Sequence, residues 1–203
     1  DMHKRKMFRI KEVEDHISKD IRQQEYRLKS RDAQELDESI LGYEDLVLYN
    51  LEAGEAVLTR DNDVDIFIDG NEKFDALKED IRNAEHFIHI QYYIIKNDVL
   101  FNQIRDILIE KAAQGVEVRV LFDAMGCRSV QHSFWRKLNE KGVQTAEFFP
   151  AILRRLQLRI NYRNHRKIVV IDNKVAYVGG FNVGKEYIDL DERFGHWRDT
   201  HLR

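Results

Sequence analysis

Cysteine and proline are almost absent from this sequence of 203 residues, each occurring once. The single cysteine, Cys127, excludes an internal disulfide framework and leaves no second thiol for a structural zinc site, which fits a cytosol-facing domain. The sequence also lacks any run of about 18 apolar residues, the length that a membrane-spanning helix requires. The basic residues at positions 2–6 are not followed by the apolar stretch that a signal peptide carries. These residues therefore predict no membrane-spanning helix.

A large excess of charge of either sign is missing as well. Lysine and arginine number 33 against 36 aspartates and glutamates, for a net charge of -3. This balance provides no chain-wide attraction to nucleic acid or to an anionic membrane, so nucleic acid is not an expected partner. Basic residues instead concentrate after Pro150, at Arg154, Arg155, Arg159, Arg163, Arg166 and Lys167. This stretch is either a solvated loop or a local guide for anionic head groups.

Two parts of the chain differ in composition. Residues 1–60 are rich in charge, with apolar residues at helical intervals such as Val13, Ile17 and Ile21, and predict an N-terminal helical arm. This arm either packs on its own domain or lies on a membrane surface. Residues 61–203 predict a second domain, in which strands alternate with helices.

The alternation in the second domain indicates its fold class. Strands are expected at 64–68, 86–95, 116–122, 143–149, 168–171 and 175–178, and the last four residues also have the pattern of a strand. Helices are expected at 72–84, 99–114 and 130–141, with a turn at Gly70-Asn71 before the first. This order predicts an α/β domain with a largely parallel or mixed sheet flanked by helices.

The main chemical pattern is His165-Arg166-Lys167, followed by the apolar run 168–171 and Asp172. Side chains alternate between the two faces of a strand, so His165 and Lys167 are expected to project together into one pocket. Gly179-Gly180 removes side chains where backbone must approach a ligand. Asn182 adds an amide that can hold a phosphate oxygen.

This pattern, HxKxxxxD continued by Gly-Gly-Phe-Asn, resembles the signature of the phospholipase D superfamily. Tyr92-Tyr93, Glu186-Tyr187 and the segment 197–201 are similar to those of bacterial cardiolipin synthases, and the resemblance extends from about Val64 to Arg203. It implies a phospholipase D-like fold in which the motif residues His165, Lys167 and Asp172 form the catalytic group. His165 would attack phosphorus, while Lys167, Asn182 and Gly180 would bind the phosphate. It implies no metal and no cofactor.

Three acidic residues have different expected roles. Asp172 stands at the far end of its strand, where it is expected to support the site by fixing the turn or pairing with a basic residue rather than by touching substrate. The resemblance implies that a separate acid orients the His165 ring. Asp199 is the first choice for this acid and Glu186 the second.

Only one copy of the motif is present. The seven other histidines lack a lysine two residues on and an aspartate seven residues on, namely His3, His16, His86, His89, His132, His196 and His201. The resemblance implies that a second motif supplies the acid, from a C-terminal half beyond residue 203 or from a second copy of the chain. We expect the longer chain, with membrane-spanning segments before residue 1, and little or no activity from this part alone.

The resemblance thus implies half of a phosphatidyltransferase that makes cardiolipin and glycerol from two phosphatidylglycerol molecules through a phosphohistidine intermediate. Its setting would be an anionic bacterial cell membrane, with the catalytic domain on the cytoplasmic side. A phospholipase D-type hydrolase or a nuclease is an alternative with water as acceptor. A noncatalytic membrane-docking domain is another.

Overall fold

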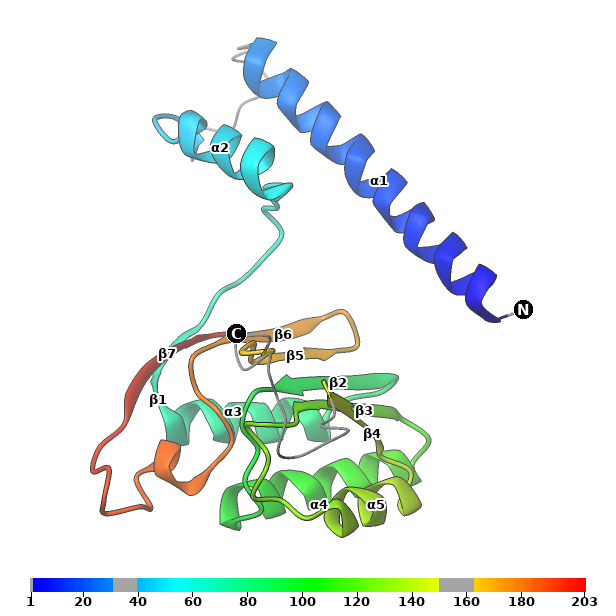
Figure 1. Cartoon of the computed structure of the whole chain (residues 1–203). Helices are drawn as coiled ribbons and strands as arrows, with labels where there is room; N and C mark the ends of the chain where they lie inside the picture. The colour runs from blue at the N-terminus through cyan, green and yellow to red at the C-terminus, as the bar shows by residue number, and fades with distance from the viewer. Residues whose placement is uncertain (1, 31–39, 150–162) are drawn as a thin grey trace. The chain divides into compact units, whose positions relative to one another are not determined.

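The computed structural model describes residues 2–30, 40–149 and 163–203, which form two compact units, Asp1–Asp63 and Val64–Arg203 (Figure 1). The first unit contains α1 (Met2–Ser30) and α2 (Glu44–Gly54). Lys29 joins them, with its Nζ 2.6 Å from Glu25 and 2.9 Å from Glu52. The helices expected in the arm are therefore present. None of the described helices is both long and apolar enough to cross a membrane.

The second unit is built on a seven-stranded mixed sheet with the order β1-β7-β6-β5-β2-β3-β4. The strands are β1 (Ile66–Asp69), β2 (Phe87–Tyr92), β3 (Glu117–Asp123), β4 (Gln144–Phe148), β5 (Ile168–Ile171), β6 (Val175–Gly179) and β7 (Arg198–Leu202). β2, β3 and β4 run parallel, whereas β5 pairs antiparallel with β2 and β6 pairs antiparallel with β5. The predicted α/β class and mixed sheet are confirmed.

Three helices cover one face of this sheet, α3 (Gly70–Arg82), α4 (Val99–Ala113) and α5 (His132–Glu140) (Figure 1). A short 3₁₀ helix, η2 (Lys185–Ile188), follows β6. The apolar stripes of the helices pack on the inward residues of the central strands, and together they form one core. In this core the ring of Trp135 stacks on that of Phe122 at a centroid distance of 3.8 Å. The predicted helices are confirmed, with ends that differ by one or two residues.

The turn predicted at Gly70-Asn71 is wrong, because α3 already begins at Gly70. Asp69 caps this helix through its side-chain oxygen, which accepts a hydrogen bond of 3.1 Å from the backbone N–H of Glu72. A Cβ atom on Gly70 would lie 1.6 Å from the carbonyl oxygen of Tyr187. The glycine is therefore needed for the close approach of η2 rather than for a turn.

Candidate active site

Four chain segments meet at one edge of the sheet. Because β5 runs antiparallel to β2, the residues before β5 lie at the same edge as those after β2 and β3. The residues after β6 return to this edge as well, since β6 runs antiparallel to β5. This edge therefore collects residues 93–98, 123–131, 163–167 and 180–184, which include most of the predicted site.

His165 and Lys167 lie side by side at this edge. The Nζ atom of Lys167 is 3.1 Å from Nδ1 and 3.4 Å from Nε2 of His165, and it also donates to the His165 carbonyl oxygen at 2.8 Å. Lys167 is only 4% exposed, whereas His165 is exposed. An accessible imidazole and a largely buried amine thus lie together, although residues 163–167 precede β5 and are not part of a strand.

The ring of Tyr93 lies against both motif residues. Its ring centroid is 4.5 Å from that of His165 and 5.5 Å from Nζ of Lys167. The loop after β3 packs directly behind it, because a Cβ atom on Gly126 would lie only 2.0 Å from the Tyr93 carbonyl oxygen. Cys127 donates its Sγ–H toward the same carbonyl oxygen, over 3.6 Å. The tyrosine that touches His165 is therefore fixed from behind by the β3 loop.

Asp123, which the sequence reasoning missed, holds the segment that carries His165. It is completely buried at the end of β3, and its Oδ2 accepts a 3.1 Å hydrogen bond from the backbone N–H of Asn164. Its Oδ1 accepts from the N–H groups of Met125 and Gly126, at 2.8 and 3.2 Å. One buried carboxylate thus links two of the segments at this edge.

Burial and charge set the protonation of the two motif residues. The pKa of His165 is lowered, mainly by burial and then by the positive charge of Lys167, while Asp123 opposes the shift. The pKa of Lys167 is also lowered by burial, and the charge of Asp199 partly restores it. Near neutral pH, His165 is therefore the neutral member of the pair and keeps a lone pair for attack.

Gly180 and Asp199 pack against each other. A Cβ atom on Gly180 would lie 1.9 Å from Oδ1 of Asp199, so any side chain at this position would force the carboxylate to move. Asp199 also accepts a 2.7 Å hydrogen bond from the backbone N–H of Thr200. Within the described part of the chain, no hydrogen bond joins His165 to Asp199 or to Glu186. The negative charge of Asp199 instead raises the pKa of Lys167 and so favours its protonated form.

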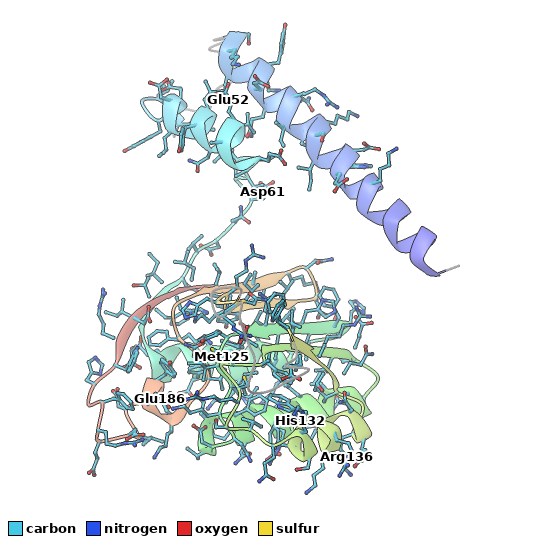
Figure 2. All side chains as sticks on the ribbon, viewed as in Figure 1. Glu52, Asp61, Met125, His132, Arg136 and Glu186 are labelled. Atoms are coloured by element: carbon cyan, nitrogen blue, oxygen red, sulfur yellow. The ribbon has the colours of Figure 1, made fainter. Side chains whose placement is uncertain are left out.

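The amide of Asn182 is already engaged at both ends. Its Oδ1 accepts a 3.0 Å hydrogen bond from the backbone N–H of Ile94, and its Nδ2 donates to the hydroxyl of Tyr187 at 3.1 Å. Because Nδ2 carries two hydrogens, one N–H remains for an anion. Glu186, 3% exposed, forms an ion pair with Lys96 (Figure 2 labels Glu186).

Asp172 lies at the opposite end of β5 from His165. Its carboxylate accepts three backbone hydrogen bonds, from Glu85 at 2.7 Å, His86 at 2.9 Å and Phe87 at 2.7 Å. These bonds keep the pKa of Asp172 below its usual value, although burial opposes them. The last aspartate of the motif thus fixes the start of β2, and its contacts are to backbone.

Some predicted features lie outside the described residues, namely Arg154, Arg155 and Arg159 of the basic stretch. Where the structure does describe the chain, one group of side chains could offer three ligand atoms to a cation, Asp69, Asp189 and His196. His196 already pairs with Asp189 at 2.8 Å, and none of the three belongs to the motif.

The amino-acid sequence of this chain is similar to those of known proteins. Residues 77–193 match the family model described as "Cardiolipin synthase, PLD-like domain". A cardiolipin synthase of Oceanobacillus iheyensis is 51% identical over 164 residues, which cover 81% of this chain and 34% of that protein. The major cardiolipin synthase of Bacillus subtilis is 44% identical over 199 residues, which cover 98% of this chain and 40% of that protein.

Among solved structures, NucT from Helicobacter pylori aligns with a TM-score of 0.52 at 17% identity, over 69% of this chain and 83% of that chain. This likeness supports the fold alone. The chain spans two fifths or less of the length of the two cardiolipin synthases.

Proposed function

Because this chain belongs to the family of cardiolipin synthase phospholipase D-like domains, we propose that it is one half of a phosphatidyltransferase. The proposed reaction joins two phosphatidylglycerol molecules to give cardiolipin and glycerol. The high identity to two cardiolipin synthases over most of this chain favours this substrate over others that the same chemistry could use.

The observation that carries the proposal is the contact between His165 and Lys167, whose nitrogen atoms are 3.1 Å apart. In the first step, a lone pair of His165 attacks the phosphorus of one phosphatidylglycerol. The phosphorus–oxygen bond to the terminal glycerol breaks, and an acid from the second motif protonates the leaving glycerol oxygen. The product of this step is a phosphatidyl group bound to His165.

In the second step, a hydroxyl of another phosphatidylglycerol attacks the phosphohistidine. The group that donated the proton now accepts one from this hydroxyl, and the bond from phosphorus to His165 breaks. Lys167 would turn from His165 to the nonbridging oxygens in both transition states, with the remaining N–H of Asn182 beside it. The backbone N–H of Gly180 already donates to the carbonyl oxygen of Thr200 at 2.9 Å, so Gly180 serves the site through the space it leaves for Asp199. Because Lys167 is desolvated, its charge acts more strongly on the phosphate than a solvated lysine would.

We propose Asp199 as the acid that orients His165, ahead of Glu186. Glu186 already neutralises Lys96, whereas Asp199 lies over Gly180 and acts on Lys167. Binding of phosphate would draw Lys167 away from the ring nitrogens. An imidazole N–H would then be available to a carboxylate.

The proposed partner is a second motif-bearing half, in the same polypeptide or in a second copy, since this sequence carries the motif once. The relatives are more than twice the length of the matched region. The proposed setting is the anionic inner surface of a bacterial cell membrane, where both lipid substrates are present.

Turnover of labelled phosphatidylglycerol by the full-length protein tests this function. We expect labelled cardiolipin and glycerol from the wild type and none from His165→Asn, while the exposed-histidine control His86→Asn stays active. Phosphatidic acid in place of cardiolipin would identify a hydrolase. Liposome binding that His165→Asn leaves unchanged, with no turnover by the wild type, would identify a docking domain and refute the proposal.

A further inference from the structure

A pocket lined by basic side chains lies at the same edge of the sheet. It has a volume of about 590 Å³ and is bounded by the loop after β2, the start of α5 and the segment that follows η2. Four cationic side chains line it, namely Lys96, Lys137, Lys185 and Arg193. None of them belongs to the HxKxxxxD motif, and the proposed mechanism uses none of them.

Buried carboxylates hold three of these four cations in place. Asp191 is 5% exposed. Its two carboxylate oxygens accept hydrogen bonds from Nε and Nη2 of Arg193, at 2.9 and 2.7 Å. The Nζ atom of Lys185 lies 3.7 Å from the same carboxylate. Glu186, which is 3% exposed, holds Lys96. Burying carboxylates has a desolvation cost, which their cationic partners offset. These ion pairs therefore hold the cations in place, while the cationic side chains themselves stay open to solvent, from 38% exposed for Lys96 to 77% for Arg193.

The pocket keeps an excess of positive charge after these pairs are formed. Asp98, which also lines it, uses its oxygens to accept the backbone N–H groups of Leu100, Phe101 and Lys185. Lys137 has no acidic partner among the residues that the structure describes. Its ammonium is thus available to an anionic ligand.

Backbone hydrogen bonds connect Lys96, which lines this pocket, to the residue that follows Asn182. The backbone N–H of Lys96 donates to the carbonyl oxygen of Val183 at 2.9 Å, and the N–H of Val183 donates to the carbonyl oxygen of Ile94 at 3.1 Å. Val183 directly follows Asn182, whose side chain also binds Ile94. Lys96 is therefore attached to the same short backbone ladder that positions Asn182.

We propose that this pocket binds the phosphate of the second, acceptor phosphoglycerol head group. This assignment rests on the proposed transferase function. Its product holds two phosphates joined by a single glycerol, so an acceptor that reaches the phosphohistidine must keep its own phosphate close beside the first. A cationic pocket connected to the backbone beside Asn182 meets this requirement, and Ser129, Gln131 and Ser133 in its lining offer hydrogen bonds to glycerol hydroxyls. Transfer to water would need no such site.

Binding to this chain itself tests the proposal, and the measurement needs no turnover. ¹⁵N NMR titrations follow backbone amides near Lys137 and Lys185 as glycerol 1-phosphate, inorganic phosphate or glycerol is added. We expect saturable shifts at these amides with glycerol 1-phosphate, weaker binding of inorganic phosphate and none of glycerol. The double variant Lys137→Gln/Lys185→Gln should weaken binding by about tenfold, because two charge-assisted contacts are lost.

The exposed Lys141→Gln variant is the matched control and should bind as the wild type does. His165→Asn should leave the shifts near Lys137 in place, which separates this pocket from the motif site. Shifts confined to the neighbourhood of His165, or an unchanged affinity in the double variant, would overturn the proposal. Equal affinity for inorganic phosphate and glycerol 1-phosphate would overturn the assignment to a head group. Failure of the transferase assay alone would not alter these binding results.

Discussion

His201→Leu should make the protein less sensitive to acid. His201 is completely buried on β7, and neither of its ring nitrogens has a hydrogen-bond partner. Burial, followed by the charges of Lys73 and Lys167, lowers the pKa of His201 to about 3. Tyr177 and Phe181 pack near its ring, at centroid distances of 6.4 and 6.1 Å. The folded protein therefore keeps this imidazole neutral.

The magnitude follows from proton linkage. An unfolded chain protonates a histidine with a pKa of about 6.5, so between pH 6.5 and pH 3 the unfolded state binds more protons at His201 than the folded state does. Stability therefore falls as the pH drops through about 6.5. With the folded pKa of His201 near 3, the loss between pH 7 and pH 5 is about 2 kcal/mol. Leucine cannot titrate, so His201→Leu should remove this loss.

Urea unfolding followed by tryptophan fluorescence measures the effect. Both tryptophans, Trp135 and Trp197, lie in the unit Val64–Arg203, so the signal reports that unit alone. At pH 7 the variant should be at least as stable as the wild type, because an apolar group replaces a buried polar group without partners. His86→Gln, at an exposed position, is the control. An equal loss between pH 7 and pH 5 in wild type and His201→Leu would refute the reasoning.

Three further changes test other contacts of the site. Lys167→Met should raise the pKa of His165 in an NMR titration of its imidazole, because after burial the Lys167 charge is the main cause that lowers it. Asp172→Asn should reduce the free energy of unfolding by about 1–3 kcal/mol in urea, since a neutral amide accepts backbone hydrogen bonds less well. It should also flatten the acid dependence, because a lowered carboxyl pKa adds stability that is lost as the pH falls through it. Gly180→Ala should lower transferase turnover by at least about tenfold, because its methyl would displace Asp199, which lies 1.9 Å from that position. A turnover equal to that of the wild type would contradict the last prediction.

The fold could be predicted from periodicity because most of its elements bury one face. The strands and helices of the second unit carry apolar residues at the spacing of their own secondary structure, and the mixed sheet followed from their alternation. The exception at Gly70 has a tertiary cause. Its missing side chain makes room for the Tyr187 carbonyl, which stands 117 residues later, and local turn preferences contain no information about that contact.

The contacts of the site also differ in whether the local sequence predicts them or the tertiary fold creates them. His165 and Lys167 are two residues apart, so alternation along an extended segment predicts that their side chains lie together, as their 3.1 Å contact shows. Asp123 acts on Asn164 across 41 residues, and only the pairing of β3 beside β2 brings these residues together. The available signal was an aspartate at the end of an otherwise apolar strand, whose carboxyl end borders the edge that holds the motif. The sequence alone did not identify its partner.

The sheet register also explains why glycine stands at position 179. His201 lies opposite Gly179 on β6, and Ile168 lies opposite Val178. Lys167 directly precedes β5, and extending the same register by one residue would put it opposite Gly179. A Cβ atom on Gly179 would lie 2.4 Å from the carbonyl oxygen of Thr200 and 2.5 Å from Cα of His201. The glycine therefore lets the backbone of β7 approach β6, which sets the neutral His201 imidazole in the same row as Lys167. Because His201 stays neutral, it adds no second positive charge beside Lys167, which remains the cation available to the phosphate in this row.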